Sequence, residues 1–168
     1  MRTKTTNIYT FDELSDEAKA RACEAFRANG FEYNWSDEWR ASLRGFLDAF
    51  PVNLKNWSVS TCGQTWFKYA MMNDDEADLT GQALADILPV LGNECPFTGY
   101  CGDESFLAPY RAFMLKPDKR SYSDLMSDCL NSGFNDWESD MEYQESDEYI
   151  GDFLRANGYE FEDDGSIA

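Results

Sequence analysis

The sequence predicts an α+β protein in which several helices pack on a small antiparallel sheet, within a single domain of residues 1–168. Three observations favour this class. Apolar residues recur at helical spacing in several segments that begin with capping residues. Polar and aromatic residues alternate in residues 57–72, as is typical of strands. The chain is 43% hydrophobic and 15% aromatic, so it has enough large side chains to form a core.

Two helices are expected in the first 51 residues. Thr10 and Glu13 have the spacing of a capping box, and Ser15 is an alternative cap for the same helix. The second helix is expected to begin at Ser36, because acidic residues follow it directly and an apolar stripe runs along one face. Pro51 ends this second helix.

The middle of the chain is expected to contain a hairpin and two helices. Residues 57–72 predict two strands, joined by a turn at Cys62-Gly63-Gln64. Apolar spacing predicts a helix from Thr80 to Leu91 and another from Phe106 to Leu115. Pro109 is expected near the first turn of the latter helix, and a loop rich in Gly, Pro and Cys separates the two.

The last third is expected to be mainly helical. Ser121 or Ser123 caps a long helix, and a shorter helix starts at Ser146. A strand at 159–161, a turn at 163–165 and a possible return strand then end the chain. The long helix has an apolar seam of heptad-like spacing, formed by Met126, Leu130, Trp137 and Met141, with Gly133 and Phe134 between them.

One short pattern occurs twice. Residues 27–33 and 155–161 both read Arg-Ala-Asn-Gly followed by an aromatic residue, Glu and a second aromatic residue. In both cases the Asn-Gly pair is expected to stop a helix. An internal duplication and a repeated use of the same capping chemistry are both possible explanations. The two helices differ in length by three residues, which favours the second explanation.

The chain is strongly acidic. It has 32 Asp and Glu residues, 14 Lys and Arg residues and no His, which gives a formal net charge of −18. A net charge of about 2–8 in magnitude suffices for the solubility of a small domain. The surface should repel nucleic acid and anionic lipid and attract basic proteins. We therefore expect a positively charged partner and no direct binding to nucleic acid or membrane; adaptation to high salt is the alternative.

The residues of common catalytic systems are missing. Without His, Ser-His-Asp and Cys-His nucleophile systems are excluded, and no phosphate-binding glycine motif occurs. Asp136, Glu138 and Asp140 alternate as in a calcium-binding EF-hand loop, but Met141 and Asp147 stand where that loop needs Gly and Glu. We expect a protein that is not an enzyme and has no cofactor and no metal site, with carboxylate-based metal-assisted catalysis as a third hypothesis.

The sequence also predicts a cytoplasmic location. No segment reaches the roughly 18 apolar residues of a membrane span, and residues 1–10 lack the apolar stretch of a secretory signal. The five cysteines are scattered and odd in number, which is typical of reduced thiols. Cys95 and Cys101 are close enough in the sequence that a bridge between them stays an alternative.

The negative charge is concentrated in a helical region at 121–158. Residues 121–168 contain 14 acidic residues and one basic residue, whereas residues 1–120 contain 18 and 13. Helical neighbours at three- or four-residue steps lie about 5–6 Å apart, so a row such as Asp124, Asp128, Glu138, Glu142 and Glu145 can imitate a line of phosphates. A solvated acidic face without a partner is the alternative. The candidate contact residues are Asp136, Glu138, Asp140, Glu142, Glu145, Asp147 and Glu148, with Asp74, Asp75 and Glu76 as a second patch.

Three segments, residues 9–19, 99–104 and 147–161, resemble a group of poorly characterised phage and prophage proteins, some of which are described as antitoxin-like. Small acidic proteins of mobile elements are similar in character to anti-CRISPR and anti-restriction proteins. The resemblance implies an inhibitor of a host defence complex in the host cytoplasm, which binds a basic nucleic-acid-binding surface, in one version as a DNA mimic. The alternative is an antitoxin or protein-interaction module whose acidity serves solubility.

Overall fold

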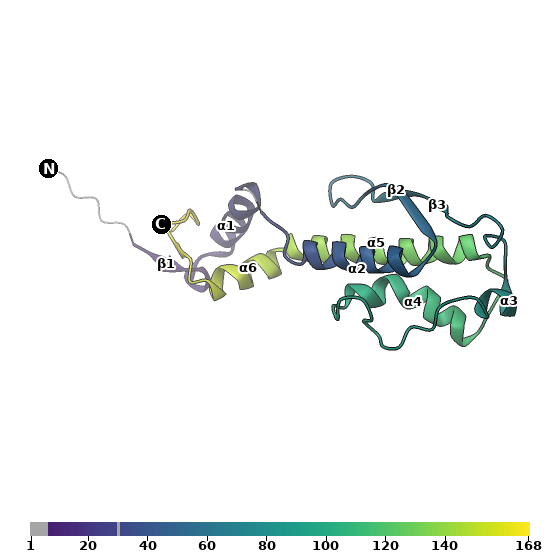
Figure 1. Cartoon of the computed structure of the whole chain (residues 1–168). Helices are drawn as coiled ribbons and strands as arrows, with labels where there is room; N and C mark the ends of the chain where they lie inside the picture. The colour runs from purple at the N-terminus through teal and green to yellow at the C-terminus, as the bar shows by residue number, and fades with distance from the viewer. Residues whose placement is uncertain (1–6, 30) are drawn as a thin grey trace. The chain divides into compact units, whose positions relative to one another are not determined.

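The computed structural model describes residues 7–29 and 31–168 and confirms the α+β class (Figure 1). The contacts divide the chain into a terminal unit, which runs to Asn34 and resumes at Glu142–Ala168, and a central unit, Trp35–Met141. The expectation of a single domain stays a prediction. The elements are β1 (Tyr9–Thr10), the 3-10 helix η1 (Phe11–Glu13), α1 (Asp16–Ala28), α2 (Ser36–Ala49), β2 (Val52–Ser58), β3 (Trp66–Met71), α3 (Gly81–Ala85), α4 (Gly102–Leu115), α5 (Tyr122–Gln144), α6 (Asp147–Ala156) and β4 (Glu160–Phe161).

Both caps expected near the N-terminus are used, each by a different helix. The Glu13 carboxylate accepts a hydrogen bond from the Thr10 backbone N–H at 2.8 Å, and this capping box begins η1. Ser15 Oγ accepts from the Ala18 N–H and begins α1. α1 ends at Ala28, with Asn29 as its C-cap, whereas Gly30 of the expected Asn-Gly stop lies outside the described residues.

The terminal unit is closed by a small sheet. β1 pairs antiparallel with β4, with Tyr9 opposite Phe161. The strand, the turn and the return expected after residue 158 are confirmed, since Phe161 also bridges to Ile167. The turn needs Gly165, which has a φ of +91° and lies against the backbone of Ala18. The core of this unit consists of Phe11, Leu14, Ala18, Ala22, Cys23, Ile150, Leu154 and Phe161.

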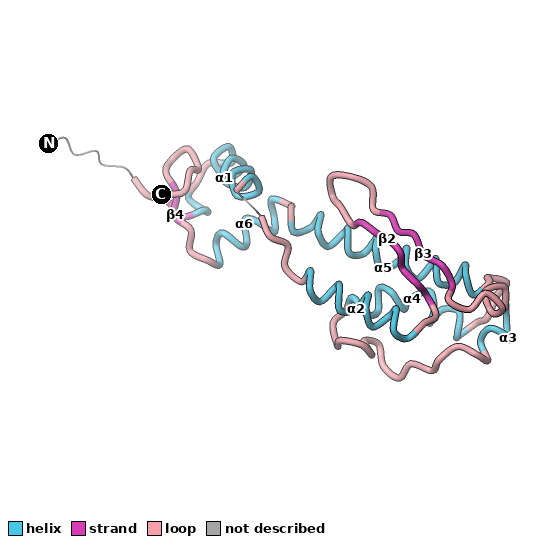
Figure 2. Tube along the Cα trace, turned by 45° about the horizontal axis from the view of Figure 1, so that its top comes forward, coloured by secondary structure: helices cyan, strands magenta, loops and turns pink. Residues whose placement is uncertain are grey.

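The central unit packs three helices, α2, α4 and α5, with the β2–β3 hairpin (Figures 1 and 2). Phe134 of α5 is fully buried and contacts the rings of Phe67 from the hairpin and Phe106 from α4. A Cβ at Gly133 would overlap the Phe106 ring, so the glycine lets α4 approach α5 closely. The expected seam of α5 is therefore a core contact, and Met126, Leu130 and Trp137 are buried in it.

Three expectations for the central unit were wrong in their boundaries. The helix expected at 80–91 ends at Ala85, and a turn brings Leu88 into the core instead. α4 begins at Gly102, so Pro109 lies in the helix interior and not near the first turn. The first strand of the hairpin begins at Val52, five residues earlier than expected. No helix in the described part of the chain is long and apolar enough to span a membrane.

Candidate functional site

The ten predicted contact residues are divided between the two units. Asp136, Glu138 and Asp140 belong to the central unit, as does the patch at 74–76. The other four residues, Glu142, Glu145, Asp147 and Glu148, belong to the terminal unit. The acidic residues are therefore two sets on two compact units, and each set has its own surroundings.

In the terminal unit, two of the four predicted residues hold the fold together. Arg27, near the end of α1, forms an ion pair with Asp147, and its Nε donates a hydrogen bond to the backbone carbonyl of Glu145 at 2.7 Å. The Glu145 carboxylate accepts a hydrogen bond from the Tyr33 hydroxyl. These contacts join the end of α1 and the segment after it to the start of α6. Asp147 and Glu145 thus have internal partners that compete with an external one.

Glu142 and Glu148 differ from these two residues. Both are exposed, and within residues 7–29 and 31–168 their carboxylates form no hydrogen bond and no ion pair. Each carboxylate is therefore available to a cation from outside without the loss of an internal contact. In the terminal unit, these two carboxylates fit the predicted contact role best.

In the central unit, Asp140 is anchored to the aromatic core. Its carboxylate accepts a hydrogen bond from Trp39 Nε1 at 3.0 Å, and the Trp39 ring stacks on Trp137, with centroids 5.8 Å apart and an interplanar angle of 5°. Asp136 and Glu138 lie on either side of Trp137 in the helix. Asp136 is exposed and Glu138 half-buried, and the carboxylates of both are unpaired within the described chain. Because α5 turns by about 100° per residue, these two carboxylates point to different sides of the helix.

The patch at 74–76 is a loop after β3, in which Asp74 and Asp75 are exposed and Glu76 is half-buried. The backbone N–H groups of Glu76 and Ala77 donate to Asn73 and Asp74, which gives the loop a tight turn. The loop is fixed to the start of α5, because the Ser123 N–H donates to the Ala77 carbonyl at 3.1 Å. The carboxylates of Asp74, Asp75 and Glu76 form no hydrogen bond or ion pair with the described residues. The loop thus presents three adjacent negative charges on a fixed backbone.

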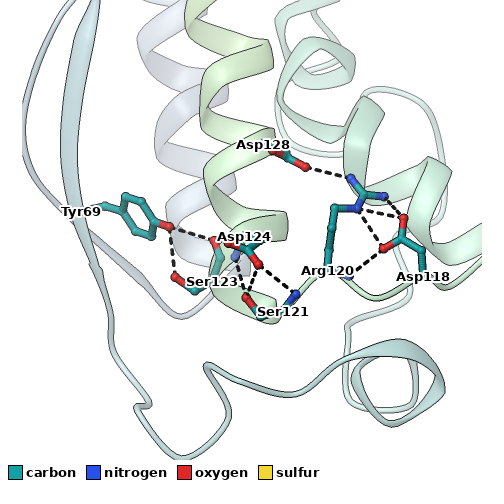
Figure 3. Close-up of polar contacts among 7 residues, drawn as sticks. All are labelled: Tyr69, Asp118, Arg120, Ser121, Ser123, Asp124 and Asp128. Carbon is teal, nitrogen blue, oxygen red and sulfur yellow. Dashed lines mark hydrogen bonds and ion pairs between the residues drawn. The ribbon is translucent and has the colours of Figure 1, made fainter.

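The first two carboxylates of the expected phosphate-like row are occupied by internal contacts (Figure 3). Ser121, one of the two candidate caps, accepts from the Asp124 N–H and donates to the Asp124 carboxylate, whereas the Ser123 carbonyl accepts from the Tyr69 hydroxyl. Arg120 joins Asp118 and Asp128 with N–O distances of 2.9 and 3.0 Å. The Arg120 guanidinium lowers the pKa of Asp118 through its hydrogen bonds. The carboxylates at the start of α5 therefore have internal partners and are not part of an open acidic row.

Two aromatic residues, Tyr100 near Asp140 and Trp35 stacked on Tyr100, were missed by the sequence reasoning. The Trp35 ring is 54% exposed and stacks on Tyr100 with centroids 6.0 Å apart, and Tyr100 meets Trp39 edge to face. Burial, followed by the charge of Asp140, raises the pKa of Tyr100 above its usual range, so its hydroxyl stays protonated. Trp35 has a φ of +66°, which is rare for a residue with a side chain. That backbone conformation is the signal that periodicity could not provide.

The described acidic residues and cysteines are not grouped as metal ligands. Across the described ranges, no group of three or more His, Cys, Asp or Glu side chains is arranged to hold a metal ion. Asp136, Glu138 and Asp140 lie within a regular helix, not in a calcium-binding loop. All five cysteines are free thiols, Cys95 and Cys101 included. Comparisons with protein-family models, with curated proteins and with solved structures found no match.

Proposed function

We propose that the protein is an inhibitor from a phage or another mobile element, which acts in the host cytoplasm on a defence complex of the CRISPR or restriction type. It binds the basic nucleic-acid-binding surface of that complex through its unpaired carboxylates. The observation that carries this proposal is a set of seven predicted carboxylates that form no hydrogen bond or ion pair with the described residues: Asp74, Asp75, Glu76, Asp136, Glu138, Glu142 and Glu148.

Unpaired carboxylates suit this role for a physical reason. A carboxylate that accepts charge-assisted hydrogen bonds from Arg or Lys replaces a phosphate oxygen, and no internal ion pair has to break first. The net charge of −18 adds a long-range attraction that speeds the encounter with a basic surface. Because salt screens exposed charges beyond about 8–10 Å, inhibition should weaken as salt rises.

The test compares two variants of equal charge. The site variant carries Asp136→Asn, Glu138→Gln, Glu142→Gln and Glu148→Gln, and the control variant carries Glu24→Gln, Asp48→Asn, Glu94→Gln and Asp163→Asn. All four control carboxylates are exposed and outside the predicted set. Binding of target DNA by a panel of purified CRISPR effector and restriction complexes is measured by gel shift. For a complex that the wild-type protein inhibits, the site variant should be weaker by at least about tenfold, and the control by less than about twofold.

The outcome distinguishes position from total charge. Equal losses in the two variants would show that only net charge matters and would contradict a specific role for the predicted carboxylates. A panel in which no complex is inhibited would contradict the proposed target class. Inhibition that does not change with salt would contradict the mimicry version in particular.

The alternative function, an antitoxin or protein-interaction module, is supported by a different surface. Val90 and Leu115 are 89% and 88% exposed, and with Leu91 and Met114 they line a mainly apolar hollow of about 310 Å³ in the central unit. Exposed apolar clusters often mark protein contacts. In that case Val90→Ser with Leu115→Ser abolishes partner binding, while the acidic site variant retains it.

A further inference from the structure

One hollow of the terminal unit has aromatic walls. Its volume is about 450 Å³, which is within the range of about 300–1,000 Å³ that is usual for ligand sites. Five aromatic rings, two amides, one carboxylate and one aliphatic side chain line it. They belong to Phe26, Asn29, Phe31, Glu32, Asn34, Tyr149, Phe153, Tyr159 and Ile167.

Two of these rings occupy the same position in the repeated sequence pattern. Phe31 and Tyr159 are the first aromatic residues after the two Arg-Ala-Asn-Gly segments, and both line the hollow. The Phe26 ring lies between them, with centroids 6.0 Å from Phe31 and 6.2 Å from Tyr159. α1 and α6 have 13 and 10 residues, as the sequence predicts. The aromatic residues that follow two similar helix ends thus line the same hollow and contact the same ring, Phe26.

The remaining wall is fixed by polar contacts. The Asn34 side-chain amide donates to the Tyr149 hydroxyl at 2.6 Å. The Asn34 backbone N–H donates to Gln144 Oε1 at 2.7 Å, and Gln144 Nε2 donates to the Asn34 carbonyl at 3.1 Å. Gln144 is only 1% exposed, so its position is set by the fold. The segment that carries Phe31 and Glu32 is therefore held in place, although all five rings are only half-buried.

The chemistry of the lining favours a cation. The faces of aromatic rings carry partial negative charge and attract an ammonium or guanidinium group within about 6 Å. Glu32 adds a full negative charge, and among the described residues neither Lys nor Arg lines the hollow. An anion would be repelled by this lining and by the net charge of the chain. A guanidinium is planar, can stack on a ring and can still donate hydrogen bonds to a carboxylate.

We propose that this hollow binds an arginine side chain from a basic segment of the protein partner. The inference rests on the proposed function, because it assumes a basic partner, and it adds a specific anchor to the diffuse attraction of the acidic faces. The guanidinium stacks on the aromatic wall, and Glu32 accepts its N–H groups.

The probe is the peptide acetyl-Gly-Arg-Gly-amide, titrated into the full chain and followed by NMR of the aromatic side chains. The control peptide has citrulline, a neutral residue of nearly the same shape, in place of Arg. The Arg peptide should shift the resonances of Phe31 and Tyr159 with a millimolar dissociation constant, and the citrulline peptide should not. Phe31→Leu and Glu32→Gln should each weaken binding by roughly threefold to tenfold. Glu24→Gln, an exposed α1 carboxylate outside the hollow, should leave it unchanged.

Three results would overturn the inference: no shifts with the Arg peptide, equal binding of the citrulline peptide, or tighter binding of the corresponding Lys peptide. Glu32→Gln tests the charge at an exposed position, so the conclusion does not depend on whether Phe31→Leu folds. The proposed function can fail separately. If the peptide binds here but the acidic site variant inhibits as well as wild type, the arginine site is supported and the proposed acidic interface is contradicted. If Glu32→Gln leaves inhibition unchanged and the peptide does not bind, only the proposed arginine site is contradicted.

Discussion

Gln144, the last residue of α5, binds the backbone of Asn34 with both ends of its side-chain amide. The N–H of Asn34 donates to Oε1 at 2.7 Å, and Nε2 donates to the carbonyl of Asn34 at 3.1 Å. Such a pair copies the two hydrogen bonds that a neighbouring strand would provide. Gln144 lies 110 positions from Asn34 in the sequence, and its side chain is almost fully buried. This single side chain therefore fixes the segment after α1.

Gln144→Met should loosen this segment, because Met has a similar length but replaces neither hydrogen bond. A buried donor or acceptor without a partner costs about 1–3 kcal/mol. The amide hydrogen of Asn34 should therefore exchange roughly 5- to 150-fold faster than in the wild type. Hydrogen exchange is the suitable measurement, since all five Trp residues lie in the central unit and fluorescence does not report on the terminal unit. The control is Gln82→Met, at an exposed position, which should leave the exchange rate of Asn34 unchanged. If Gln144→Met also left this rate unchanged, the two hydrogen bonds between Gln144 and Asn34 would not be what fixes the segment.

Local signals in the sequence were sufficient to predict most of the helices. Ser15 and Ser146 cap α1 and α6 as expected, because an N-cap depends only on residues within one turn. The buried seam of α5 was predictable for the same reason, since helical spacing alone places its residues on one face. The expected helix at 80–91 failed where Pro89 and a turn at Leu88 oppose the apolar spacing.

The contacts that decide the candidate site could not be predicted locally. Arg27 pairs with Asp147 across 120 positions, and Trp39 donates to Asp140 across 101. Nothing in the sequence distinguishes these paired carboxylates from the unpaired Asp136 or Glu148. Gln144 follows Met141 at helical spacing, but nothing local in the sequence shows that this polar side chain is buried. Only the fold shows which acidic residues are occupied and which remain available to a partner.

Gly133→Ala should destabilise the central unit. Alanine normally favours a helix by about 1 kcal/mol over glycine, but here the added Cβ would overlap the fully buried ring of Phe106. Overpacking of a core costs about 1–3 kcal/mol or more, so we expect a net loss of at least about 1 kcal/mol in the free energy of unfolding. Urea unfolding followed by Trp fluorescence measures it. At Gly92 an added Cβ meets nothing within 4 Å, so Gly92→Ala should stay within about 0.5 kcal/mol of the wild type; an equally stable Gly133→Ala would show that α4 and α5 can separate without cost.

The thiol of Cys129 should react with alkylating reagents far more slowly than those of Cys62 and Cys101. Its side chain is fully buried, and this burial raises the pKa of the thiol to about 12. Because the thiolate is the reactive species, a rise of about three units above the ordinary value lowers its fraction about a thousandfold near neutral pH. Cys62 and Cys101 are exposed. Alkylation followed by peptide mass mapping should label these two first and Cys129 only after unfolding in urea. Labelling of Cys129 at the rate of Cys62 would contradict the described core.

Asp103 provides a test of pH dependence, because it is a buried carboxylate that the fold keeps ionised. Burial raises its pKa, but hydrogen bonds from the Ser42 hydroxyl and from Thr98 and Phe97 outweigh this and hold the pKa below its usual range. The Phe97 and Thr98 N–H groups donate to the same oxygen, at 2.8 and 2.7 Å. The carboxylate thus orders the loop before α4.

Since the folded-state pKa of Asp103 is lower than the unfolded value of about 3.9, ionised Asp103 contributes stability above that pH and loses it as the pH falls through the folded pKa. Asp103→Asn keeps the shape and removes the charge. It should cost about 1–2 kcal/mol near pH 7, because the hydrogen bonds lose their charge assistance. The difference from the wild type should then shrink as the pH falls towards about 3. Urea unfolding followed by Trp fluorescence at several pH values gives the free energy of unfolding of the wild type and of Asp103→Asn.

The control is Asp48→Asn, at an exposed position of α2, which measures the general effect of one lost charge. A difference between Asp103→Asn and the wild type that does not change with pH would show that shape, and not ionisation, makes Asp103 important.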